Sequence, residues 1–254
     1  PYLERPSAAP ENEAQTLYEE AKSAGHFLLG TDGDVWPSPG CCHQGLGMID
    51  FTSKAARTFW EGILSNATSA GFAGFKLDYG EDLVPQLLSA RLSVVMSDGQ
   101  TERTARTYPL GYHATYHAAL AAVRDDGFLL GRASTYGGQT VLDAVWPGDL
   151  DNGFEKMENK NVGGLPAVVV AAQTLAMSGF PVFGSDTGGY RGGMPEREAL
   201  LRWSEHTALT IVMQLGGAGD HHNPWLYDDE AGQIYASLAR LHMRLVPYCL
   251  LYTS

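Results

Sequence analysis

The stretch of residues 74–82, with the sequence GFKLDYGED, constrains the fold of this chain more than any other. It begins with mostly apolar and aromatic residues and then places three carboxylates within five residues, Asp78, Glu81 and Asp82. This pattern is typical of a buried strand whose C-terminal end carries acidic side chains into a cleft. Asp78 is therefore the first candidate for a reactive residue.

Helical and extended segments alternate along the rest of the chain. The apolar spacing and the positions of glycine and proline predict helices at 11–24, 50–66, 112–123, 165–177 and 195–207. Strands are expected at 25–30, 71–78, 128–131, 140–145, 180–184 and 210–215, and loops at 31–47 and 97–107. Because polar and glycine-rich residues collect where the strands end, the sequence predicts a parallel α/β fold. It favours a (β/α) barrel over a doubly wound sheet.

The composition excludes one large class of partners. The chain has 17 basic and 29 acidic residues, a net charge of -12, and no cluster of lysine and arginine. A nucleic-acid partner would require a basic face, so this class is excluded. The three cysteines, two of them adjacent at Cys41 and Cys42, are too few for a disulfide framework and lack the spacing of a zinc site. Free thiols in a reducing compartment such as the cytoplasm are expected.

Residues 162–185 contain no charged side chain and are long enough to cross a membrane. Prolines and polar residues interrupt the segment, among them Pro166, Gln173 and Pro181. We therefore expect a buried helix and a buried strand joined by a turn at 179–181, and no membrane partner.

The predicted strands end in a set of charged side chains: Asp78 with Glu81, Arg132, Asp149 and Asp186. Because the strand ends of one barrel converge, these side chains can meet in space. A retaining glycosidase needs two carboxyl groups about 5 Å apart, one as nucleophile and one as proton donor. Carboxylates at strand ends serve metal binding and proton abstraction equally well, so the layout alone leaves all three chemistries open.

Five motifs in order, over about residues 50–224, resemble glycoside hydrolase family 31. They are FKLDYGE (75–81), GRAS (131–134), WPGD (146–149), FGSDTGGY (183–190) and LRW (201–203). The resemblance implies a retaining α-glycosidase that hydrolyses a terminal α-linked sugar. It implies a small carbohydrate as substrate, no cofactor and no metal ligands.

The resemblance also implies roles for individual residues. Asp78 matches the nucleophile of the family, and Asp149 matches the general acid/base. The other matching positions line or shape the sugar site and are Arg132, Asp186, Glu81, Trp146 and Tyr190.

The local sequence around the two acids agrees with these roles. Asp149 follows an aromatic residue and a proline, a setting that can desolvate a carboxyl group and keep it protonated. Asp78 must stay ionised, and strand alternation places Lys76 on the same face. Lys76 is therefore the expected cationic neighbour of Asp78.

One site departs from the family pattern. Family members commonly carry an arginine and, two residues later, a histidine after the last barrel strand, where this chain has Gln214 and Gly216. A hydrogen bond to a sugar hydroxyl is therefore missing or is made by another side chain, such as His221 or His222. The YGE ending of the first motif resembles α-xylosidases, sulfoquinovosidases and α-galactosidases more than glucosidases.

The resemblance covers part of a catalytic domain. The matched strands look like the fourth to eighth of the barrel, so residues 1–254 are expected to form an incomplete (β/α)8 barrel. The earlier barrel strands, the N-terminal β-sandwich and the C-terminal sheets of the family have no counterpart in this sequence. An incomplete barrel leaves strand edges unpaired, so the chain alone is expected to be unstable or prone to aggregation, and inactive.

Two other functions remain open at this stage. The residues at 214 and 216 are compatible with a non-catalytic carbohydrate-binding barrel of the same family. A metal-dependent hydrolase on the same fold would lose its activity when a chelator is added. We interpret His113 and His117 as ordinary helix histidines satisfied by hydrogen bonds, and Trp203 as a core residue.

Overall fold

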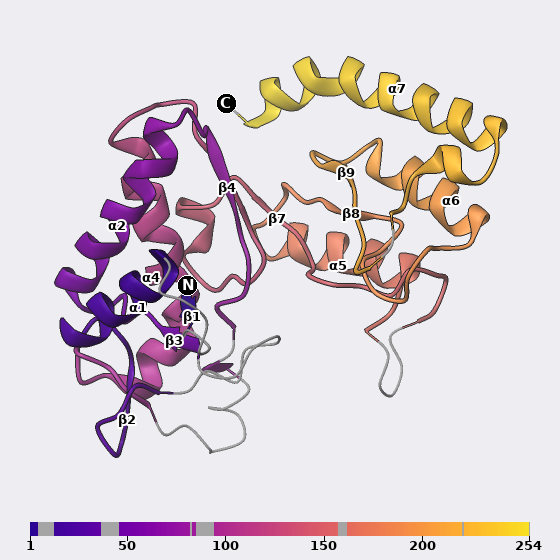
Figure 1. Cartoon of the computed structure of the whole chain (residues 1–254). Coiled ribbons are helices and arrows are strands. Elements are labelled where there is room, and N and C mark those ends of the chain that lie inside the picture. Colours follow the sequence, from indigo (N-terminus) through magenta and orange to yellow (C-terminus); the bar gives the residue numbers. More distant parts are fainter. Residues whose placement is uncertain are drawn as a thin grey trace. The chain divides into compact units, whose positions relative to one another are not determined.

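The computed structural model describes residues 1–4, 13–36, 46–81, 83–84, 94–156, 162–219 and 221–253. The chain divides into two compact units, Pro1–Asp143 and Ala144–Ser254 (Figure 1). The predictions for Cys41, Cys42 and Asp82 lie outside the described residues.

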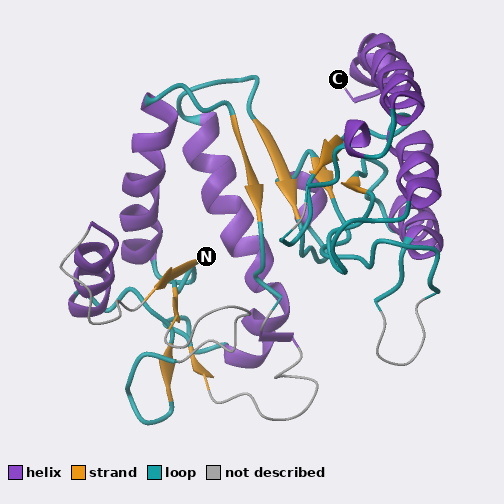
Figure 2. Ribbon diagram, turned by 45° about the vertical axis from the view of Figure 1, so that its right-hand side comes forward, coloured by secondary structure: helices purple, strands orange, loops and turns teal. Residues whose placement is uncertain are grey.

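The first unit combines helices with three pairs of strands. Strands β1 and β3 pair antiparallel, β2 and β5 pair antiparallel, and β4 and β6 pair parallel (Figure 2). The elements in order are β1 (Tyr2–Glu4), α1 (Glu13–Ser23), β2 (Leu29–Gly30), β3 (Leu46–Met48), α2 (Lys54–Ser69), β4 (Gly74–Leu77), β5 (Val94–Val95), α4 (Thr101–Ala121), β6 (Phe128–Gly131) and the 3-10 helix η1 (Gly138–Thr140). The connection from β4 through α4 to β6 is the strand–helix–strand unit that the sequence predicts.

Helix α2 forms where its cap and its apolar stripe predict it. The side chain of Ser53 accepts a hydrogen bond from the backbone N–H of Ala56, which caps the N-terminus. Trp60 and Leu64 are buried on one face, and α2 packs beside α4 (Figure 2). An aromatic cluster joins the two helices, with ring centroids 5.2 to 6.4 Å apart. Its members are Phe51, Trp60, Tyr108, Tyr112 and Tyr116.

Three local predictions for the first unit are wrong. Residues 97–107 were expected to be loop, but α4 begins at Thr101 and contains Pro109. The first turns of α4 are polar in sequence, so the local pattern does not reveal the helix. The buried Ala105, Tyr108 and Tyr112 form a stripe that packs α4 against the core. The end of the expected loop 31–47 belongs to β3, and the expected strand 140–145 shrinks to Ala144–Val145, because η1 takes Thr140 and a turn and a bend follow it.

The second unit alternates short strands with helices. Its elements are β7 (Ala144–Val145), α5 (Leu165–Met177), β8 (Ser185–Thr187), α6 (Arg197–Thr207), β9 (Met213–Leu215), the 3-10 helix η2 (Pro224–Leu226) and α7 (Asp229–Thr253). Val145 bridges Phe183 in parallel, and β8 pairs in parallel with β9. Helix α6 packs on β8, and α7 packs on α6 (Figure 1). The parallel alternation is confirmed, whereas the incomplete (β/α)8 barrel stays a prediction.

Helix α5 has the predicted bounds but not the predicted burial. Only Val168 is buried, whereas Val170 is 62% exposed and Met177 is 89% exposed. The expectation that this apolar helix is core is therefore wrong for the chain as described. Among the described helices, none combines the length and the apolar character needed to cross a membrane.

Candidate active site

The parallel register of β4 and β6 brings Asp78 and Arg132 together. Leu77 pairs with Gly131 at the end of the ladder, so the next residues of both strands lie side by side. The N–H of Arg132 donates to the carbonyl of Leu77 at 3.0 Å, which extends the ladder by one step. The ends of these two strands therefore meet, whereas a shared sugar site stays a prediction.

The carboxylate of Asp78 is held through one of its oxygens. Oδ1 accepts from Nη1 of Arg132 at 2.9 Å and from the N–H of Tyr79 at 2.8 Å. Within the described part of the chain, Oδ2 accepts no hydrogen bond. Because the side chain of Asp78 is 47% exposed, Oδ2 is available to a molecule from solvent.

Arg132 joins both acids of the first motif. Its Nε lies 2.9 Å from Oε1 of Glu81, while Nη1 contacts Asp78. A guanidinium presents donors in a fixed fork, so it orients two carboxylates and offsets their mutual repulsion. The cation in contact with Asp78 is Arg132, so the expectation that Lys76 fills this place is wrong; the side chain of Lys76 is exposed.

A tyrosine beside Asp78 adopts an unusual backbone conformation. Tyr79 has φ +58°, a left-handed conformation that is uncommon for a residue with a side chain. Its ring faces the guanidinium of Arg132, with 4.9 Å between Cζ and the ring centroid. This cation–π contact holds Arg132 from a second side.

Tyr112 supports the same turn from helix α4. Its hydroxyl donates to the carbonyl of Asp78 at 3.3 Å, and burial raises the pKa of Tyr112 well above its usual value. The hydroxyl therefore stays protonated and remains a donor. Sequence reasoning missed the site contacts of Tyr79 and Tyr112, because neither the cation–π contact nor the long-range hydrogen bond has a local sequence signal.

In the second unit, Trp146 and Asp149 follow β7. Trp146 is buried, and Asp149 is half-buried two residues after Pro147. The intervening Gly148 has φ +80°, a conformation that glycine adopts without strain. The turn therefore places the half-buried Asp149 after the end of a strand, and its role as an acid stays a prediction.

Backbone hydrogen bonds tie together the segments that follow the three strands of this unit. The N–H groups of Tyr190 and Arg191 both donate to the carbonyl of Leu150 at 2.9 Å. The N–H of Ala218 donates to the carbonyl of Tyr190 at 2.8 Å. Tyr190 is thus anchored to Leu150, which follows Asp149 in the sequence, and to the segment that follows β9.

Asp186 lies within β8 and is 4% exposed, whereas the sequence placed it just after a strand expected at 180–184. The side-chain amide of Gln214, its register partner on β9, donates to Oδ1 of Asp186. Beside it, the indole of Trp203 donates to the hydroxyl of Ser185 at 3.0 Å, which confirms Trp203 as a core residue. Gln214, identified as a departure from the family pattern, is thus part of the candidate site.

The histidines that the sequence analysis considered differ in burial and in hydrogen bonding. His222 is buried and its Nε2 lies 3.0 Å from the carbonyl of Gly193, whereas His221 is exposed. His113 is buried, and neither ring nitrogen hydrogen-bonds to any described residue. The expectation that hydrogen bonds satisfy His113 is therefore wrong. Burial, aided by the positive amino terminus of the chain, lowers the pKa of His113 to about 4. His117, one turn along, is exposed.

Comparison with known proteins identifies the relatives of this chain. The family described as "Glycosyl hydrolases family 31 TIM-barrel domain" matches residues 2–253. An α-xylosidase of Emericella nidulans is 26% identical over 241 residues, covering 94% of this chain and 29% of the relative. A sulfoquinovosidase of Escherichia coli (strain K12) is 28% identical over 210 residues, covering 80% of this chain and 29% of the relative.

A solved structure extends the likeness to the fold. A GH31 family sulfoquinovosidase from E. rectale, in complex with an aza-sugar inhibitor, matches with a TM-score of 0.78 at 24% identity. The match covers 91% of this chain and 34% of the other chain. The chain therefore spans about a third of the length of each of these proteins.

Proposed function

The chain belongs to glycoside hydrolase family 31, and from this premise we propose that it supplies the catalytic acids of a retaining α-glycosidase. The substrate is a small carbohydrate with a terminal α-linked sugar. The observation that carries the proposal is the state of Asp78: one oxygen is fixed by Arg132 and Tyr79, and the other is exposed without a hydrogen-bond donor among the described residues.

The proposed reaction has two displacement steps. Oδ2 of Asp78 attacks the anomeric carbon while the carboxyl group of Asp149 gives its proton to the leaving glycosidic oxygen. The glycosidic bond breaks and a covalent glycosyl ester forms on Asp78. Asp149 then removes a proton from water, the water attacks the anomeric carbon, and the ester bond to Asp78 breaks.

The neighbouring residues have positioning and binding roles in this proposal. Arg132 fixes the carboxylate plane of Asp78, and Glu81 fixes Arg132 from the other side. Asp186, in contact with Gln214, is an acceptor for sugar hydroxyls. Trp146 and Tyr190 shape the sugar site around Asp149. No cofactor takes part.

We favour an α-xyloside or a sulfoquinovoside as the substrate over an α-glucoside. The YGE sequence after Asp78 supports this choice, and relatives named α-xylosidase and sulfoquinovosidase are among the matches. A neutral α-glucosidase of mouse is also among them at 25% identity, so the choice rests mainly on the motif.

A panel of nitrophenyl α-glycosides tests the proposal. It is applied to this chain and to the longest open reading frame that contains it, and turnover is expected only from the longer protein. Asp149→Ala should lower kcat/KM, which reports the first displacement, far more for natural glycosides than for nitrophenyl glycosides, because nitrophenolate leaves without an acid. An equal loss of kcat/KM for both substrate types would remove Asp149 from the role of acid.

A non-catalytic carbohydrate-binding barrel is the second candidate. The observation that favours it is Gln214, whose amide contacts Asp186 where family members commonly carry a charged arginine. This candidate predicts saccharide binding by the longer protein without release of nitrophenol, and Gln214→Arg would then be the first substitution to test for recovered turnover.

A further inference from the structure

A groove on the second unit lies outside the candidate active site. It has a volume of about 490 Å³, within the range of small-molecule sites. Its lining comes from η2, the following turn and the first part of α7. The lining residues include Trp225, Asp228, Asp229, Gln233, Ala236 and Arg240.

The groove presents an indole ring to solvent. Trp225 is 65% exposed, whereas the other four tryptophans of the chain are no more than 7% exposed. Next to the indole ring, the surface of α7 forms a shallow floor, because Gly232 has no side chain and Ala236 has only a methyl group. A flat apolar ring beside a shallow floor can hold a flat ligand with an apolar face.

Polar groups surround the ring, and several of them are available to a ligand. Within the described part of the chain, the side chains of Asp229, Gln233 and Arg240 make no hydrogen bond or ion pair. Together they offer carboxylate acceptors, an amide that both donates and accepts, and guanidinium donors. This mixture matches hydroxyl groups, which both donate and accept.

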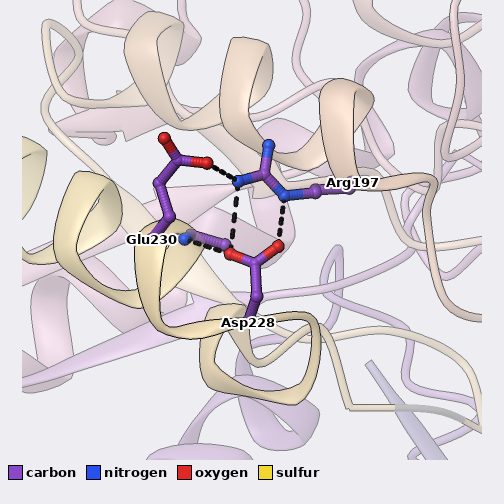
Figure 3. Close-up of polar contacts among 4 residues, drawn as sticks. Arg197, Asp228 and Glu230 are labelled. Atoms are coloured by element: carbon purple, nitrogen blue, oxygen red, sulfur yellow. Dashed lines mark hydrogen bonds and ion pairs between the residues drawn. The ribbon is translucent and has the colours of Figure 1, made fainter.

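The rim of the groove is held in place before any ligand binds. Arg197 clamps Asp228 through Nε at 2.7 Å and Nη2 at 3.2 Å, and Nη2 also reaches Glu230 at 2.6 Å (Figure 3). Oδ1 of Asp228 accepts from the N–H of Ala231 at 2.7 Å, which caps α7. A rim ordered in advance reduces the entropy lost on binding.

We propose that this groove is a saccharide-binding site. The C–H face of a pyranose ring stacks on Trp225, and its hydroxyl groups bond to Gln233, Asp229 and Arg240. Three carboxylates, those of Asp228, Asp229 and Glu230, against two guanidinium groups, those of Arg197 and Arg240, disfavour an anionic ligand, and the open polar rim disfavours an apolar peptide. The site shares no residue with Asp78 or Asp149 and does not depend on their proposed roles.

Tryptophan fluorescence tests the proposal directly, because Trp225 is the solvent-exposed indole. Maltotriose and isomaltotriose are the probes, titrated into the full chain up to their solubility limits. The expected result is a saturable blue shift, as the sugar removes water from the indole. No saturable change with either probe would overturn the proposal.

Substitutions locate the binding. Trp225→Ala should lower the affinity at least about tenfold, as expected for the loss of an aromatic anchor. Isothermal titration measures this, since the variant lacks the fluorescent reporter. Gln233→Ala and Arg240→Ala, which keep Trp225, should each weaken binding roughly threefold to tenfold in the fluorescence titration.

A control separates this site from others. Tyr136→Ala, which removes an aromatic side chain that is 92% exposed in the first unit, should leave the affinity unchanged. Unchanged affinity in Trp225→Ala, or loss of binding in Tyr136→Ala, would assign the sugar to another site and overturn the proposal. Neither outcome bears on catalysis by Asp78.

Discussion

The two units hold their acidic residues by different means. In the first unit, Asp78 and Glu81 are held by one cationic side chain, Arg132, at contacts of 2.9 Å. In the second unit, Asp186 is held by the neutral amide of Gln214, and backbone hydrogen bonds at Leu150 fix the segment after Asp149. One arrangement depends on a charged side chain, and the other on a neutral side-chain amide and on backbone hydrogen bonds.

This difference indicates how each unit tolerates change. A charged cluster can be dismantled by single side-chain substitutions with little loss of stability when it is partly exposed. A backbone-built arrangement resists such substitutions but is sensitive to added atoms at close approaches. The difference between the units also agrees with the proposed roles, in which Asp78 is an anionic nucleophile and Asp149 is an acid in a less charged setting.

The largest effect is expected from Asp78→Asn in the longest protein that contains this chain. Asparagine keeps an Oδ1 acceptor for Arg132 and Tyr79 but is not a nucleophile, so turnover should fall at least ~10⁴-fold. Steady-state hydrolysis of a nitrophenyl α-glycoside measures it, and a thermal unfolding scan checks that the variant folds. Activity within tenfold of the parent, on the scale where each ~1.4 kcal/mol is one factor of ten, would exclude Asp78 as nucleophile.

Arg132→Ala should have the second largest effect on activity. It removes the fork that orients Asp78, so turnover should fall roughly 100-fold, while unfolding free energy changes by less than ~1 kcal/mol. Arg132→Lys keeps the positive charge but not the forked donors, so its turnover should lie between that of the parent and that of Arg132→Ala.

The matched control for Arg132 is Arg202→Ala. Arg202 also contacts two carboxylates, those of Glu198 and Glu205, but on the exposed face of α6. Its loss should leave turnover unchanged. If both arginine variants lose activity equally, the effect of Arg132 is general electrostatics and not orientation of Asp78.

His113 predicts a pH dependence that is specific to the first unit. The pKa of His113 is about 4 in the folded protein and 6.5 in the unfolded chain. Between these pH values the unfolded chain therefore binds more protons than the folded protein. Stability should therefore fall as pH decreases from 6.5 to about 4, by at most ~3 kcal/mol from this group.

Denaturant titration at several pH values measures this slope. His113→Leu should flatten it relative to the parent chain, and His117→Leu, an exposed histidine one turn away, should leave it unchanged. An unchanged slope in His113→Leu would show that other groups determine acid unfolding.

The smallest expected effect tests the second unit with two adjacent glycines. A Cβ added at Gly217 would lie 2.2 Å from Nε2 of His222, whereas one added at Gly216 meets nothing within 4 Å. Gly217→Ala should therefore displace the buried His222 from the carbonyl of Gly193 and cost ~1–2 kcal/mol. Gly216→Ala should change stability by less than ~0.5 kcal/mol. Equal melting temperatures for both variants would contradict the close packing of this segment.

The sequence predicted the elements with strong local signals. Periodicity and glycine positions gave the bounds of α5 and β6, and the motif at Asp78 correctly marked the end of a strand. The parallel pairing then follows, because strands joined through a helix pair in parallel. Local pattern was therefore sufficient for most of the helix–strand order.

Features that depend on tertiary contacts were not predictable in this way. The pairing of Asp78 with Arg132 arises from the register of β4 with β6, and alternation along one strand pointed to Lys76 instead. The first turns of α4 carry few apolar residues, so their helicity depends on packing that the local pattern does not show. Burial of Asp186 likewise comes from its partner strand and not from its own neighbours.

Covalent trapping tests the central claim most directly. The longest protein that contains this chain is incubated with a mechanism-based α-glycosyl fluoride inactivator, and the labelled peptide is sequenced by mass spectrometry. We predict one glycosyl adduct on the carboxyl group of Asp78, absent from the Asp78→Asn variant. A label on a different carboxylate, or equal labelling of the variant, would contradict the assignment of Asp78 as the nucleophile.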